Sequence, residues 1–128
     1  MDAFFLTLEE VLAIHDDQIA RYGGARGVRD MNRLLSALAA PASTFEGRFL
    51  HRNIAEMAAA YLFHLVTNHP FVDGNKRTGA VAAVVFLALN GISFPAPEKE
   101  FEKVVLAVAS GKLSEVAVVR FIRRYLGG

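Results

Sequence analysis

Apolar residues recur at intervals of three and four along most of the chain, the spacing that predicts amphipathic α-helices. The pattern predicts helices over about residues 8–22, 30–39, 53–68, 75–90, 98–110 and 114–126. Valine is frequent in the last two segments, so strands are a local alternative there. Segment length and the spacing of apolar positions favour helix in both.

Residues that start or stop helices stand at the predicted ends. Thr7 and Glu10 have the form of a capping box, in which each side chain pairs with the other residue's backbone N–H. The glycines at 23–24 end this first helix. Asp30 has the character of an N-cap for the second helix, and Pro41 ends it.

The segment 75–90 is apolar on every side, which predicts a central, buried helix. Residues 42–52 form the least regular stretch, and the chain shows neither an internal repeat nor a low-complexity linker. We therefore expect an all-α fold: a compact bundle of about six helices around the helix at about 75–90. Residues 1–128 are expected to form a single domain.

Composition narrows the possible partners and compartments. Fourteen Lys and Arg against thirteen Asp and Glu leave a net charge of +1, so no global field favours nucleic acid or an acidic surface. Cysteine is absent, which excludes disulfides and thiolate metal sites. The chain begins without the pattern of a signal peptide. Its longest apolar run, residues 79–89, is shorter than the ~20 residues that span a bilayer. We expect a soluble, cytoplasmic protein without direct nucleic-acid or membrane partners.

The segment 69–77, His-Pro-Phe-Val-Asp-Gly-Asn-Lys-Arg, is the main candidate for a functional site. Lys76 and Arg77 fall in the first turn of the predicted central helix, where the helix dipole disfavours cations. A bound anion reverses that argument, because free backbone amides at a helix N-terminus bind phosphates. Gly74 would let the backbone approach such a ligand closely, and the amide of Asn75 would join the cradle.

Two further groups in this segment fit phosphate chemistry. His69 has an ordinary pKa of ~6.5, which suits a general base near neutral pH. Asp73 offers a hard oxygen ligand of the kind that binds magnesium. A base, a metal-binding carboxylate and an anion cradle are the components of phosphoryl transfer. A polar helix cap with solvated charges is the alternative interpretation of the same residues.

The nine residues 69–77 resemble the signature of the Fic/Doc family in its Doc form; the Fic form has glycine at the position of Lys76. The resemblance extends over essentially the whole chain. Further segments that resemble Doc-like toxins are Ile14-His15-Asp16, Arg21-Tyr22-Gly23-Gly24, Gly27-Val28-Arg29-Asp30 and Asn90-Gly91. The resemblance implies a small helical Fic fold and the toxin half of a bacterial type II toxin–antitoxin pair.

Doc toxins are protein kinases that transfer the ATP γ-phosphate to a threonine of elongation factor Tu and so block translation. Carried over to this chain, the resemblance implies that His69 activates the target hydroxyl and that Asp73 binds Mg²⁺. It also implies that Asn75, Lys76 and Arg77 bind the nucleotide phosphates. The expected ligands are thus ATP and Mg²⁺, and the expected protein substrate is elongation factor Tu.

Two other functions stay open on the sequence. Members with the Fic form are adenylyltransferases, and the bulky cation Lys76 in place of glycine favours phosphate transfer over AMP transfer. An inactive binding module is the second alternative; the complete set from His69 to Arg77 weighs against it. Fic-type enzymes are often silenced by a Ser/Thr-x-x-x-Glu motif, which this sequence lacks. The resemblance therefore implies inhibition by a Phd-like antitoxin.

The other histidines and the loop cations are weaker candidates for functional residues. His15 lies on the apolar face of its helix and is expected to be a hydrogen-bonded structural residue that could support the site. His64 is expected to have a packing or solvent role, and His51 has no evident partner. The cations Arg26, Arg29 and Arg48 are expected to be solvated. Loop 23–30 is a candidate docking rim for the protein substrate.

Overall fold

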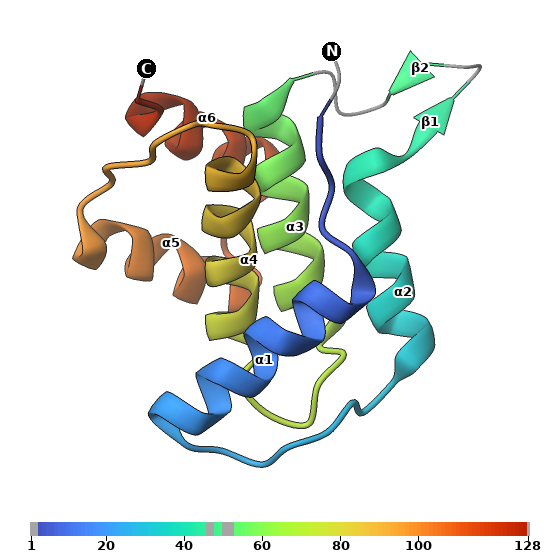
Figure 1. Ribbon diagram of the computed structural model, residues 1–128. Helices are drawn as coiled ribbons and strands as arrows, with labels where there is room; N and C mark the ends of the chain where they lie inside the picture. Colours follow the sequence, from blue (N-terminus) through green and yellow to red (C-terminus); the bar gives the residue numbers. More distant parts are fainter. Residues whose placement is uncertain (1–2, 46–47, 50–52, 128) are drawn as a thin grey trace.

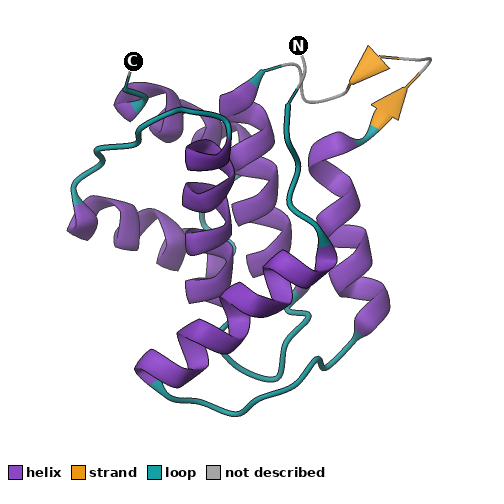
Figure 2. Ribbon diagram, viewed as in Figure 1, coloured by secondary structure: helices purple, strands orange, loops and turns teal. Residues whose placement is uncertain are grey.

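The computed structural model describes residues 3–45, 48–49 and 53–127, and its secondary structure confirms the all-α class (Figures 1 and 2). Each expected helix is present with ends within one residue of the predicted ones. The elements are α1 Leu8–Tyr22, α2 Met31–Ala39, the short 3-10 helix η1 Ala40–Ala42, strands β1 Thr44–Phe45 and β2 Arg48–Phe49, α3 Ile54–Asn68, α4 Asn75–Leu89, α5 Glu98–Ala109 and α6 Glu115–Tyr125. The two short strands pair antiparallel within the stretch expected to be irregular. His51 lies outside the described residues.

The predicted helix starts are confirmed by their hydrogen bonds. Thr7 and Glu10 form both halves of the capping box, and the Asp30 side chain accepts from the N–H of Arg33. Asn53 and Ser114 cap α3 and α6 in the same way. Among the described residues, none of the helices is long and apolar enough to cross a membrane.

Helix α3 lies at the centre of the bundle and packs against α4, α6, α2 and α5 (Figure 1). Helix α1 runs across one end of the α3–α4 pair, where the connection between them also lies. Helices α3 and α4 approach closely at Gly79. A Cβ atom there would lie 2.8 Å from Val66 Cγ2 and 3.3 Å from the Leu62 carbonyl oxygen. A side chain at this position would therefore require Val66 or the helix backbone to shift.

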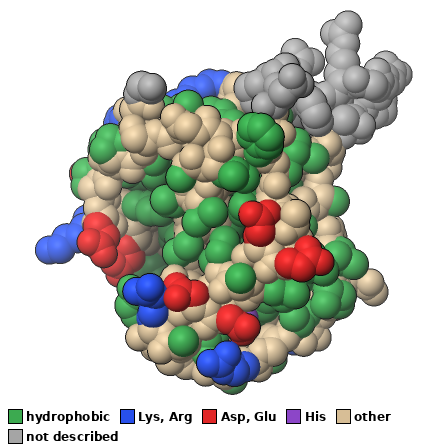
Figure 3. Space-filling view, in the orientation of Figure 1, with side chains coloured by type: hydrophobic (Ala, Val, Ile, Leu, Met, Phe, Trp, Pro, Cys, Tyr) green, Lys and Arg blue, Asp and Glu red, His purple; other side chains and the backbone are tan. Residues whose placement is uncertain are grey.

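The expectation that the helix at 75–90 is buried on every side is wrong for one face. Val84, Val85 and Leu89 are 38%, 36% and 44% exposed, whereas Ala58 and Leu62 of α3 are fully buried. Figure 3 shows hydrophobic side chains gathered across the middle of the face along which α4 runs. An apolar helix sequence shows only that burial of the helix is tolerated. Because neighbouring helices pack on only some sides of α4, the remaining face is exposed.

Two side chains tie outer segments to this centre. The buried Tyr61 hydroxyl accepts a hydrogen bond from the N–H of Leu6, 2.9 Å away, and so holds the segment before α1. Burial raises the pKa of Tyr61 to about 12, so the hydroxyl is neutral at physiological pH. His64 Nε2 lies 3.2 Å from Glu115 Oε1, which links α3 to α6. A packing or solvent role is expected for His64, and its side chain contacts a residue of a neighbouring helix.

Candidate active site

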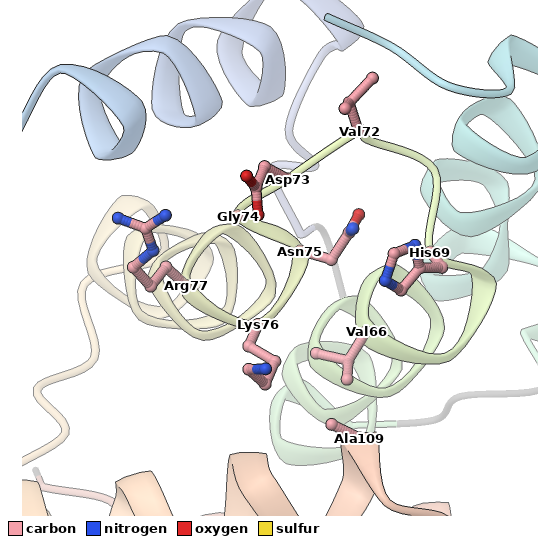
Figure 4. A pocket seen from close by; sticks show the side chains of 9 residues that line it. All are labelled: Val66, His69, Val72, Asp73, Gly74, Asn75, Lys76, Arg77 and Ala109. Carbon is pink, nitrogen blue, oxygen red and sulfur yellow. The ribbon is translucent and has the colours of Figure 1, made fainter. Parts of the chain in front are cut away.

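The connection between α3 and α4, residues 69–74, is called the motif loop below. Together with the first turn of α4 it borders a pocket of about 380 Å³ (Figure 4). The pocket is lined by Val66, His69, Val72, Asp73, Gly74, Asn75, Lys76, Arg77 and Ala109. The fold therefore brings every residue predicted for the site to one cavity. In Figure 4 the His69 ring and the Asp73 carboxylate lie apart, with Asn75 between them.

His69 ends α3 in a left-handed conformation with φ 53°, and no other described residue except glycine has positive φ. The Arg29 guanidinium donates to the His69 carbonyl oxygen from Nε at 3.0 Å and from Nη2 at 2.6 Å. The last turn of α3 contains no cation of its own, so Arg29 supplies the positive charge that a helix C-terminus attracts. The expectation that Arg29 is merely solvated is wrong. Its separation of forty residues from His69 left no signal in the sequence.

The loop between α1 and α2 pairs with the motif loop along their backbones. Val28 and Phe71 form an antiparallel bridge, and the N–H of Val72 donates to the Gly27 carbonyl at 3.0 Å. The N–H groups of Arg29 and Asp30 both donate to the Pro70 carbonyl, at 2.7 and 3.0 Å. The loop proposed as a docking rim thus also holds the motif loop in place.

Asp73 is held through two of its atoms. Its carboxylate Oδ2 accepts from the N–H of Ala25 at 3.1 Å, and its carbonyl oxygen lies 2.8 Å from His15 Nε2. Gly24 leaves room for the carboxylate, because a Cβ atom there would lie 3.2 Å from Oδ2. No cluster of three or more His, Cys, Asp or Glu side chains suited to a metal occurs in the described part of the chain. The Asp73 carboxylate is an oxygen ligand of the kind that magnesium takes together with water and phosphate oxygens.

His15 is 2% exposed and its ring stacks on Phe71, with ring centroids 3.8 Å apart and planes 6° from parallel. The expected structural, hydrogen-bonded role of His15 is confirmed. Its partners are both in the motif loop, fifty-six and fifty-eight residues away along the chain. This histidine therefore belongs to the support of the site.

Asn75 is 5% exposed, and its side chain closes the motif loop on itself. Its Oδ1 accepts from the N–H of Phe71 at 2.9 Å, and its Nδ2 donates to the Phe71 carbonyl at 3.0 Å. Both ends of the amide are therefore occupied within the loop. Because an amide NH2 group carries two hydrogens, Asn75 could still donate its second Nδ2–H to a phosphate with both of these bonds intact, and so could its backbone N–H.

We expect Asn75→Ala to lower the free energy of unfolding by about 2–4 kcal/mol, because two buried backbone groups of Phe71 lose their partners. Chemical denaturation without nucleotide measures the change. Asn32→Ala is the matched control, since Asn32 is an exposed asparagine in the first turn of α2. Equal stability of Asn75→Ala and the unsubstituted protein would contradict a clamp that stabilises the fold.

The two cations at the start of α4 have different surroundings. Arg77 donates to the carbonyl oxygens of Gln18, at 3.2 Å, and Gly23, at 2.9 Å, and its guanidinium lies over the Tyr22 ring. It therefore places positive charge at the C-terminus of α1, which compensates for its unfavourable position in α4. Lys76 is exposed, and its side chain forms no hydrogen bond or ion pair with the described residues. A bound anion would therefore compensate the charge of Lys76 more than that of Arg77.

Helix α4 begins without a capping side chain. Its N-cap, Gly74, has φ 77° and no side chain that could accept hydrogen bonds from the backbone amides of the first turn. Gly74 packs against Ile19, to which an added Cβ would lie 3.1 Å away. The backbone amides of residues 75–77 precede the first intrahelical donor, the N–H of Thr78, and these three residues line the pocket. An anion such as a phosphate fits this combination of free amides and a nearby ammonium group.

Comparison with known proteins gives consistent matches. The family model described as Fic/DOC family matches residues 5–87. The chain is 33% identical over 123 residues to a protein named Protein kinase doc from Escherichia phage P1, with 93% of each sequence covered. It is 43% identical over 75 residues to a protein named Toxin Doc from Mycolicibacterium smegmatis, covering 59% of this chain and 58% of that protein.

Proposed function

The chain belongs to the Fic/DOC family as a Doc-like member, and we propose that it is the toxin of a bacterial type II toxin–antitoxin pair, acting as a protein kinase. Residues 1–128 would form its single domain. The observation that carries the proposal is the pocket that gathers His69, Asp73 and Lys76 at the uncapped start of α4. The names of the two relatives, a kinase and a toxin, support the same assignment.

The proposed reaction transfers the γ-phosphoryl group of ATP to a threonine hydroxyl. His69 accepts the hydroxyl proton as the oxygen bonds to the γ-phosphorus, and the bond from that phosphorus to the bridging oxygen breaks to release ADP. The α4 amides and Lys76 stabilise charge on the phosphate oxygens. Asp73 fits Mg²⁺ through the chemistry of its carboxylate, and that ion would neutralise phosphate charge when bound.

Arg77 and Asn75 would contribute in a more restricted way than the motif suggests. Arg77 already donates to two carbonyls of the α1 C-terminus, so it would offer a phosphate only its remaining donors or leave those carbonyls. Asn75 would contribute its backbone N–H while its side chain keeps the loop closed. Both remain proposed phosphate-binding residues, with these limits on the groups they would use.

Labelled ATP separates the candidate activities. The protein is incubated with elongation factor Tu and ATP labelled on either the α- or the γ-phosphate. Transfer of the γ-label supports the kinase and transfer of the α-label the adenylyltransferase. Absence of both transfers would contradict enzymatic activity on this target and leave the binding module.

Replacing Lys76 by glycine is expected to lower γ-phosphoryl transfer by about a hundredfold, because one charged donor to the transferred group is lost. The initial rate of γ-label transfer measures the effect. Lys99→Gly is the matched control, since Lys99 is exposed and occupies the same position in the first turn of α5. It carries a similar backbone cost of about 0.5–1 kcal/mol. Equal rates for the two variants would remove Lys76 from the proposed mechanism.

The proposed partners follow from the same assignment. Elongation factor Tu is the proposed substrate, and a Phd-like antitoxin the proposed inhibitor, because the chain contains no Ser/Thr-x-x-x-Glu motif of its own. Both the substrate and ATP place the proposed activity in the cytoplasm. Co-expression with a small protein encoded beside this chain, followed by co-purification and a growth assay, tests the antitoxin pairing; toxicity unaffected by every such neighbour would contradict it.

A further inference from the structure

We propose that His15 is a positioning residue that holds the Asp73 end of the motif loop from α1. The inference rests on the proposed function, in which Asp73 is the metal-binding carboxylate. It concerns a residue outside the motif, on another helix, that touches neither the nucleotide nor the transferred group. Its effect would pass through the backbone of the loop.

Two independent contacts place His15 against the loop. Its Nε2 lies 2.8 Å from the carbonyl oxygen of Asp73, and its ring stacks on Phe71 with centroids 3.8 Å apart. A carbonyl oxygen can only accept a hydrogen bond, so Nε2 must carry the proton and His15 must be the donor. His15 as a whole is 2% exposed, so water has little access to either contact. One rigid side chain thus fixes two points of the motif loop.

The same region of α1 and the loop after it surround Asp73 and Gly74 on further sides. The N–H of Ala25 donates to Asp73 Oδ2 at 3.1 Å. A Cβ atom added to Gly74 would lie 3.1 Å from Ile19 Cδ1 and 3.7 Å from His15 Cδ2. The carbonyl and the carboxylate of Asp73 are therefore held by different groups. Because Gly74 is the N-cap of α4, these contacts also fix Asp73 relative to the first-turn amides.

The other end of the loop has a separate anchor. Arg29 holds the His69 carbonyl from an exposed position, whereas the hydrogen bond of His15 is to the carbonyl of Asp73. Metal-dependent nucleotide binding is the step that depends on Asp73. Loss of His15 should therefore weaken this binding more than it slows proton removal by His69. A purely structural role of His15 would lower stability without this selective effect.

Two substitutions separate the contacts of His15. His15→Phe keeps a ring that can stack on Phe71 and removes the donor; His15→Gln keeps an amide donor at the same reach and removes the ring. We expect His15→Phe to weaken Mg²⁺-dependent ATP binding about three- to tenfold, as loss of one hydrogen bond implies. His15→Gln should recover part of this affinity. Isothermal titration calorimetry with ATP, with and without Mg²⁺, measures the binding, and initial rates should show a change in KM for ATP larger than in kcat.

Val11→Ala is the matched control, because Val11 is fully buried one turn earlier on the same face of α1. It lowers stability by opening a cavity and is expected to keep the unsubstituted affinity for ATP at temperatures where it is folded. Unchanged affinity in His15→Phe, or an equal loss in Val11→Ala, would overturn the proposal.

Two measurements need no nucleotide and so remain informative if the proposed function is wrong. Hydrogen exchange of the amides of residues 72–76 should be faster in His15→Phe than in Val11→Ala under conditions where both have equal global stability; equal exchange overturns the proposal. In the unsubstituted protein, the imidazole ¹⁵N signals of His15 should show the Nε2–H tautomer. The Nδ1–H tautomer would overturn the proposal even if both His15 variants failed to fold. Absence of ATP binding by the unsubstituted protein would contradict the proposed function alone.

Discussion

We expect His69→Ala to lower phosphoryl transfer by about 10²–10⁴-fold, the range usual for loss of a general base. The imidazole borders the pocket and is exposed, so its removal leaves no cavity in the core. The backbone carbonyl oxygen of residue 69 still accepts from the Arg29 guanidinium, because this contact does not involve the side chain that is removed. The loss should therefore appear in the transfer rate of a folded protein, measured with γ-labelled ATP and by relief of toxicity in growing cells.

The backbone at His69 decides which control is informative. With φ 53°, alanine here adopts a left-handed conformation that costs about 1–2 kcal/mol. Asparagine tolerates this conformation better and cannot act as a base near neutral pH. His69→Asn should therefore lose the transfer while keeping more of the stability, as judged by thermal unfolding. A folded His69→Asn protein that transfers phosphate at the unsubstituted rate would contradict the proposed base.

The second large effect is expected for Asp73→Asn, which should weaken Mg²⁺-dependent ATP binding by about 10–100-fold. The amide oxygen can still accept from the N–H of Ala25, and the backbone carbonyl still faces His15. The substitution thus removes the negative charge with little change in the loop. Calorimetric titration of ATP across a series of Mg²⁺ concentrations measures the loss, and the affinity without Mg²⁺ should change much less.

Asp16→Asn is the matched control for this charge change. Asp16 lies on the exposed side of α1, where its carboxylate is 3.4 Å from Arg26 and its side chain is 68% exposed. An exposed pair of this kind contributes little, so we expect nearly unchanged ATP binding. If Asp73→Asn and Asp16→Asn showed the same dependence on Mg²⁺, the effect would be a general one of net charge, and Asp73 would be excluded as the ligand.

Local signals account for what was predictable about the fold. Helix ends are set within a few residues by caps such as those at Thr7 and Asp30, and by breakers such as Gly23. Apolar spacing then fixes which stretches are helical. The motif from His69 to Arg77 was recognisable because its residues are consecutive, and the turn between α3 and α4 brings them to one pocket. The sequence alone therefore determined the helices, the class of fold and the location of the candidate site.

The tertiary structure decided which groups support that site. Arg29 holds His69, His15 holds Asp73 and Phe71, and Arg77 serves the C-terminus of α1. Each contact joins residues about forty to sixty positions apart, and its partners depend on how α1 and the loop after it cross the start of α4. The same holds for the burial of α3 and the exposed face of α4. Periodicity reports a residue's face on its own helix, whereas burial and hydrogen bonding depend on which other helices cover that face.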